Sequence, residues 1–148
     1  MRQRAGRPKR RRSSEPAGRA VIAHVGWTGL AAVAVGAVLG AWLRLGLGIA
    51  LNAVHESLPL GTLAANVAGG LMIGAAVAWL ARHPELSPAW RLFMVTGFLG
   101  ALTTFSTFSV ESLELLQRGD YGWAAAHTVL HLFGSLAAAA IGFKLIAG

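Results

Sequence analysis

The chain has 148 residues, of which 55% are hydrophobic and 13% charged, and its mean hydropathy is +0.57. This composition is too apolar for a soluble domain of this size. A bilayer core of about 30 Å needs about 20 apolar residues per helix, so four spans with short loops leave no room for a soluble catalytic domain. The absence of cysteine excludes disulfides, thiolate metal sites and a cysteine nucleophile.

The net charge of +7 is carried by residues 1–19, and the remaining residues are neutral overall. Residues 1–20 are basic and rich in Pro, Gly and Ser without apolar periodicity, which predicts a disordered tail. We expect no nucleic-acid partner, because neither aromatic residues nor a fold accompany the basic residues. Ser13-Ser14-Glu15-Pro16 follows the twin arginines in place of an apolar stretch, so the first hydrophobic segment is not expected to be removed as a signal.

Residues 21–148 are predicted to form an all-α integral membrane domain of four transmembrane helices, surrounded by lipid in the cell inner (plasma) membrane. The spans are expected at about residues 26–47, 60–80, 90–116 and 122–146. All five tryptophans lie near the predicted span ends, where amphipathic rings settle at the level of the lipid headgroups. The short connections between the spans predict antiparallel neighbours.

The basic residues predict an orientation with both termini in the cytoplasm. Eleven basic residues, eight of them in the tail, fall on the side of the termini, and two fall on the other side. Without the tail the balance is only three to two. The body of the protein by itself is therefore expected to insert in either direction.

Two predicted spans carry polar stripes with a spacing of four residues, which places their members on one helix face. The second span holds Thr62 and Asn66, followed on the same face by Gly70 and Gly74, and the fourth span holds His127, His131 and Ser135. A polar side chain in a span either lines a wet path or forms hydrogen bonds that hold helices together. Two stripes of similar length favour a lined path.

The two histidines are also spaced to hold a metal ion. A zinc site is disfavoured, because the sequence shows no third strong ligand near them. A catalytic histidine needs an acidic partner to orient it, and the sequence shows none beside these two. The serines and threonines of the third span have no base in the same segment. We therefore expect that the protein is not an enzyme.

The third span is predicted to break near mid-membrane, around residues 97–100. Gly97 and Gly100 lower helix propensity by about 1 kcal/mol each, and five hydroxyl residues follow between Thr103 and Ser109. Non-helical backbone at membrane depth requires burial or a cavity, and its carbonyls suit a small cation. The alternative is a continuous helix, in which the glycines serve close packing and the hydroxyls bond back to helix carbonyls. This alternative explains either half of the segment alone, but less easily both together. Phe105 and Phe108 share a face, and their ring edges attract an anion weakly.

Three stretches together resemble the CrcB/Fluc family of fluoride channels, and the similarity extends from the first span to the fourth. The stretches are Gly40-Ala41-Trp42-Leu43-Arg44, Gly61-Thr62-Leu63-Ala64-Ala65-Asn66-Val67-Ala68-Gly69 and Gly97-Phe98-Leu99-Gly100-Ala101-Leu102-Thr103-Thr104-Phe105-Ser106-Thr107-Phe108. The third stretch is highly specific, whereas the first is weak alone. The resemblance implies a passive, fluoride-selective channel that exports fluoride from the cytoplasm and works as an antiparallel, dual-topology homodimer with two pores.

The resemblance also implies roles for individual residues. The carbonyls of Gly100 and Thr103 from both subunits would hold a structural sodium ion that is not transported. Fluoride would pass Phe105 and Phe108, the donors Asn66 and Thr62, and a polar track that includes Ser106 and Thr107. Arg44 and Glu111 match residues near the pore entry.

Two features depart from the family pattern. His127 and His131 stand where relatives often carry neutral polar residues, so we predict neutral pore-side donors and a fluoride flux that changes with pH between about 5.5 and 8. The charged tail should impose one orientation, in conflict with a dual-topology homodimer. Three explanations stay open: the tail is not decisive, an oppositely oriented paralogue is the partner, or translation starts near Val21.

Two rival functions also belong to membrane proteins of this size. The first is a small four-helix, dual-topology exporter of other small ions or cationic compounds, which depends on an acidic residue in its first span. Residues 26–47 contain none. The second is a helix-packing membrane scaffold with a nucleic-acid-binding tail, in which the polar stripes only hold helices together.

Overall fold

The structure is a computed structural model that describes residues 17–148, with side chains from residue 25 onward. Within these residues every regular element is helical. The expected disorder of residues 1–16 lies outside this range. The elements are α1 (Ala17–Leu51), the short 3-10 helix η1 (Asn52–Val54), α2 (Leu60–Arg82), α3 (Pro88–Arg91), the π-helical η2 (Leu92–Leu99), α4 (Gly100–Leu102), α5 (Phe105–Gln117) and α6 (Tyr121–Ala147). Helix α1 thus begins inside the predicted tail.

Four helical segments are long and apolar enough to cross a membrane, and the protein is therefore an integral membrane protein. They run over Val25–Val54, Leu60–Arg82, Pro88–Gln117 and Tyr121–Ala147. The prediction of four spans is confirmed, and most predicted ends lie within two residues of the observed ends. The first span is longer than expected, because α1 runs to Leu51 and η1 continues it to Val54. A kink lies at its start, at Gly26, whose φ of 66° is accessible mainly to glycine.

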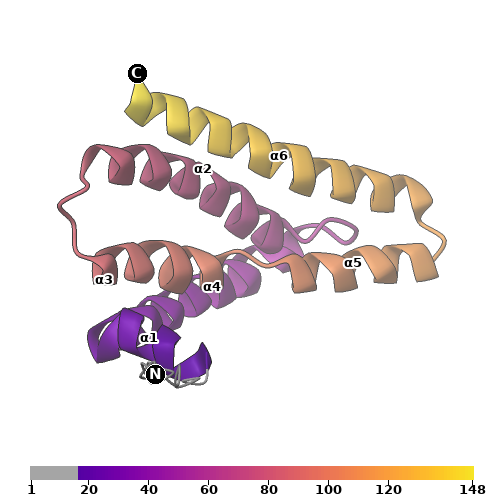
Figure 1. The fold of residues 1–148 in the computed structure, drawn as a ribbon. Helices are drawn as coiled ribbons and strands as arrows, with labels where there is room; N and C mark the ends of the chain where they lie inside the picture. The colour runs from indigo at the N-terminus through magenta and orange to yellow at the C-terminus, as the bar shows by residue number, and fades with distance from the viewer. Residues whose placement is uncertain (1–16) are drawn as a thin grey trace, which may run out of the picture.

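The third span consists of four helical pieces in one line, from α3 to α5, with an extended connection before α5 (Figure 1). That connection is Thr103 (φ −81°, ψ 152°) and Thr104 (φ −149°, ψ 118°). The expectation of an interruption around residues 97–100 was wrong in position, because Gly97 lies in the π-helix and Gly100 has helical angles of −63° and −30°. Gly97 instead allows close packing, since a Cβ there would lie 2.7 Å from the Val33 carbonyl oxygen of α1.

Glycines bring the spans into backbone contact in two places. Helix α2 packs along α6 (Figure 1), where a Cβ at Gly70 would lie 2.6 Å from the Ser135 carbonyl oxygen and one at Gly74 would collide with that of Ala139. Helix α1 packs against η2 and α4 in the same way. Small residues let membrane helices approach closely, so α6 is held along α2 and the first half of the third span is held along α1.

Candidate functional site

Polar residues from three helices meet on one side of α2. Thr62 comes from α2, Glu111 and Ser112 come from α5, and His127 comes from α6, where its side chain is fully buried. Thr62 Oγ1 donates to Glu111 Oε1 at 2.6 Å. The other carboxylate oxygen lies 3.3 Å from His127 Nε2, and His127 Nδ1 lies 3.1 Å from Ser112 Oγ. The two predicted stripes are thus connected through α5.

Glu111 corrects the expectation that the histidines have no third ligand and no acidic partner. Ligand atoms of Glu111, His127 and His131 all lie within 4.8 Å of one another. The spacing within α6 showed the two histidines, whereas the carboxylate belongs to another helix. Ser112 was also missed, although it follows Phe108 by four residues and therefore shares its helix face.

Asn66 joins the extended connection of the third span to α6. Its Oδ1 accepts from the Thr104 backbone N–H at 2.7 Å, and its Nδ2 donates to the Thr104 carbonyl at 3.0 Å. The same Nδ2 lies 3.0 Å from His131 Nδ1. One amide therefore satisfies the backbone of Thr104, which no helical partner reaches.

Phe105 and Phe108 lie on one face, as predicted, with ring centroids 5.4 Å apart. The Phe108 ring also stacks on His127 at 5.2 Å and lies 5.0 Å from His131. Both phenylalanines, with Asn66 and His131, border a groove of about 730 Å³ that we call the central groove. Thr107 and Ser106 lie beside Thr104, whose Oγ1 donates to Thr107 Oγ1 at 2.9 Å and lies 3.2 Å from Ser106 Oγ.

The carbonyls of Gly100 and Thr103 lose their helical donors at the extended connection. In a continuous helix they would accept from the N–H groups of Thr104 and Thr107. The Thr104 N–H instead donates to Asn66, and the Thr107 N–H donates to Thr104 Oγ1 at 3.1 Å. Both residues border the central groove. Carbonyl oxygens in this situation are hard ligands and fit a small cation.

Arg44 was expected near a pore entry, and the structure places it against the third span. Its Nε donates to the Ala101 carbonyl at 3.0 Å. Ala101 lies in α4, immediately before the extended connection. Arg44 therefore bonds the backbone just before that connection, whereas Asn66 bonds the connection itself at Thr104.

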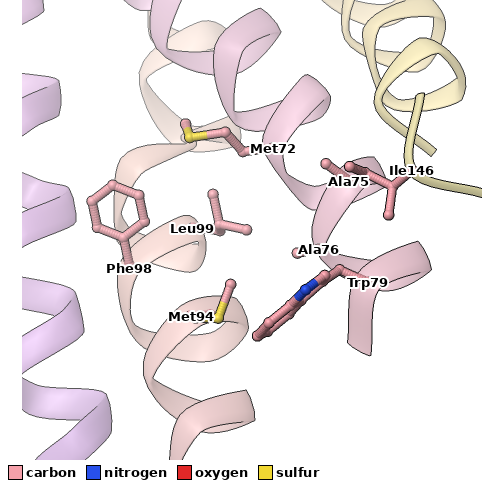
Figure 2. Close-up of a pocket in the computed structure, with 8 residues that line it drawn as sticks. All are labelled: Met72, Ala75, Ala76, Trp79, Met94, Phe98, Leu99 and Ile146. Carbon is pink, nitrogen blue, oxygen red and sulfur yellow. The ribbon is translucent and has the colours of Figure 1, made fainter. Parts of the chain in front are cut away.

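A separate cavity of about 290 Å³ lies between α2, the third span and the end of α6. Figure 2 shows Met72, Met94 and Trp79 directed into it, and its lining side chains are apolar except for the indole N–H of Trp79. One indole N–H is too little to replace the water around an ion. The polar chemistry is thus concentrated at the central groove and the Glu111–His127 pair.

The comparisons with known proteins identify the family of this chain. Residues 31–143 match the family described as "CrcB-like protein, Camphor Resistance (CrcB)". A protein of Cupriavidus pinatubonensis named "Fluoride-specific ion channel FluC" is 55% identical over 126 residues, which cover 83% of this chain and 100% of the relative. Proteins of the same name from Aromatoleum aromaticum (55% identity; 76% and 86% coverage) and Pseudomonas aeruginosa (54%; 74% and 87%) are similar.

These relatives are named as ion channels, which supports the expectation that the protein is not an enzyme. With four apolar helices, the protein is a multi-pass membrane protein, consistent with the inner membrane. The family profile covers more than half of the chain. The chain therefore belongs to the CrcB-like family.

Proposed function

We propose that the protein is a fluoride-selective channel that passively exports fluoride from the cytoplasm. The observation that carries the proposal is the central groove, where the phenylalanine pair of α5 lies beside Asn66 and His131. Fluoride is small and strongly hydrated, so a path must offer hydrogen-bond donors and weak electropositive edges in place of water. The names of relatives at 54–55% identity support the same ion.

We assign the path to residues of three helices. Phe105 and Phe108 contribute ring edges at the central groove, and Ser106 and Thr107 contribute hydroxyls at the start of α5. Polar side chains of α2 and α6 line the path in the groove and beyond it, with Glu111 and Arg44 nearer to its entry. The members from α2 and α6 are Thr62, Asn66, His127 and His131.

We further propose a structural sodium ion held by the carbonyls of Gly100 and Thr103. The diversion of their helical donors to side-chain partners supports this site. Two carbonyls from one chain are too few to replace the hydration shell of an ion. An oppositely oriented second copy would supply the same two carbonyls across a two-fold axis, which favours an antiparallel homodimer, or a pair with an oppositely oriented paralogue. The ion offsets part of the cost of removing water from fluoride.

Reconstituted liposomes test the channel. Vesicles loaded with potassium fluoride should release fluoride through the full chain when valinomycin balances the charge, and should not release chloride. Phe105→Ile and Phe108→Ile should each lower the fluoride rate at least about tenfold, or about 1.4 kcal/mol, because an aliphatic side chain has no electropositive edge. The matched control is Phe133→Ile, whose parent ring on α6 is 60% exposed, and it should conduct like the unchanged protein.

Absence of fluoride release from folded, reconstituted protein would refute the proposed function. If Phe133→Ile lowers the fluoride release rate as much as Phe105→Ile and Phe108→Ile do, the effect of those two substitutions is assigned to packing.

A further inference from the structure

The orientation of the Asn66 amide follows from its two bonds to Thr104. Oδ1 accepts from the Thr104 N–H at 2.7 Å and Nδ2 donates to the Thr104 carbonyl at 3.0 Å. If the amide were rotated by half a turn, its NH₂ group would face the Thr104 N–H, donor against donor, and its oxygen would face the Thr104 carbonyl, acceptor against acceptor. The NH₂ group is therefore the part of Asn66 that faces His131 Nδ1, at 3.0 Å.

This contact determines where His131 carries its proton. An amide N–H only donates, so Nδ1 must accept, and the neutral imidazole then carries its proton on Nε2. Nε2 has no hydrogen-bond partner and is the one such buried side-chain atom in the part of the chain that the structure describes. His131 is 5% exposed. A buried donor without a partner is costly, and natural structures retain few of them.

The surroundings of this donor fit an anion in transit. The His131 ring lies 5.0 Å from Phe108 and 4.3 Å from His127, between the central groove and the Glu111–His127 pair. Both N–H bonds of Asn66 are already used, one by Thr104 and one by His131. In this conformation the donor on the path is therefore His131, and Asn66 acts as a positioning residue.

We propose that Nε2–H of His131 is a fluoride-binding donor, held in the required tautomer by Asn66 and the Thr104 backbone. This inference rests on the proposed function. Fluoride leaving the phenylalanine pair reaches the donor when the Phe108 ring turns aside, and then passes toward His127. The donor replaces one water of the ion without adding a positive charge, so binding stays weak enough for conduction.

A transition-metal ion is the competing occupant, because Glu111, His127 and His131 resemble a two-histidine, one-carboxylate zinc set. Nδ1 of His131 is engaged by the Asn66 NH₂ group, so a metal that leaves this contact intact requires an unprotonated Nε2. Nδ1 would then carry the proton and point it at the Asn66 NH₂ group, donor against donor. The hydrogen bonds of Asn66 therefore favour the anion.

Nitrogen-15 spectroscopy of the full chain in lipid, labelled at histidine, tests the tautomer directly. His131 signals are assigned by their loss in His131→Gln. We expect the shift of an unprotonated nitrogen at Nδ1, a proton on Nε2, and a downfield move of that proton with sodium fluoride but not with sodium chloride. A proton on Nδ1, or no response to fluoride in protein that releases fluoride from liposomes, would overturn the inference while leaving the proposed function intact.

Two substitutions at the same position add a flux readout. His131→Leu removes the donor and should lower fluoride release about tenfold to a hundredfold, as expected for losing a hydrogen bond to a charged group. His131→Gln keeps an N–H donor and should retain most of the flux, whereas Leu and Gln variants that conduct equally would contradict the donor role. Each variant is compared only after its folded fraction has been measured.

Zinc chloride distinguishes the two occupants. The unchanged protein should conduct fluoride without inhibition by micromolar zinc, since His131 Nε2 has no lone pair to offer. Asn66→Asp presents an acceptor to Nδ1, should move the proton there, and should create zinc inhibition that is lost again in Asn66→Asp/His131→Gln. Zinc inhibition of the unchanged protein that disappears in His131→Gln would overturn the proposal in favour of a metal site.

Discussion

Glu111 illustrates how the neighbours of one residue define its chemistry. Its two oxygens are engaged by different helices, one by the Thr62 hydroxyl and the other by His127. A carboxylate in a membrane span is costly unless it is paired. The side chain is 12% exposed and has both partners within 3.3 Å. Its place next to the histidines is thus consistent with a structural link as well as with a position on the ion path.

Arg44 is a second residue whose neighbours define its role, and it leads to a test. Arg44→Met removes the donor to the Ala101 carbonyl, so we expect the free energy of unfolding to fall by about 1.5–3 kcal/mol, the range for a hydrogen bond to a charged group. Unfolding in mixed micelles with increasing dodecyl sulfate measures the change.

The control for Arg44 is Arg118→Met. Arg118 meets Glu114 at 3.8 Å with both side chains more than half exposed, and exposed pairs contribute about 0–1 kcal/mol. If the two substitutions destabilise equally, the Arg44 contact does not support the third span.

At the scale of elements, the third span differs from the other three because side chains replace its helical hydrogen bonds. The Asn66 amide hydrogen-bonds both the N–H and the carbonyl of Thr104, and the Thr104 hydroxyl caps α5 by accepting from the Thr107 N–H. Such caps satisfy donors that would otherwise be orphaned at a helix start. The Thr104 backbone and the Thr107 N–H therefore keep hydrogen-bond partners although the chain leaves the helix for two residues.

The contact between α2 and α6 is the second element-scale feature and carries a prediction. Gly74→Ala would place a methyl group against the Ala139 carbonyl of α6, so we expect a loss of about 1–3 kcal/mol from overpacking. Gly46→Ala in α1 is the matched control, because nothing lies within 4 Å of its Cβ position. Both substitutions change helix propensity alike.

The same dodecyl sulfate titration measures both glycine variants. Equal stabilities of the two would show that α2 and α6 can separate at no cost, contrary to the close approach at Gly70 and Gly74. Fluoride release should fall with stability in Gly74→Ala only.

At the scale of the whole molecule, the distribution of basic residues determines the direction in which the chain inserts into the membrane. The described body has nearly balanced basic residues on its two ends, whereas the tail adds eight on one side. Deleting residues 1–19 should therefore change a single orientation into a mixture, because loop charge sets topology. The chain has no cysteine, so a single cysteine placed at the Gly119 turn reports its side of the membrane by labelling with an impermeant maleimide.

The prediction is contradicted if the full chain and the chain without residues 1–19 give the same labelling, because the tail then does not decide orientation. If that shared result is a mixture of labelled and protected cysteine, the conflict between the tail and an antiparallel homodimer also disappears.

Much of the fold was predictable because it follows from local rules. The number of spans, most of their ends and the shared face of Phe105 and Phe108 depend on hydropathy and helical periodicity, which are properties of neighbouring residues. The break was misplaced because Gly97 and Gly100 carry the same local signal whether they interrupt a helix or let another helix approach. Only the position of α1 against Gly97 distinguishes the two.

The sequence by itself determined a membrane protein of four helices, its polar stripes and its family resemblance. The tertiary structure decided which of those polar residues meet. Glu111 joins His127, Arg44 bonds Ala101, and Asn66 sets the hydrogen bonding of His131 across 65 residues of chain. These partners lie on different helices, and their pairing depends on helix packing and rotation, for which no local pattern in the sequence is a guide.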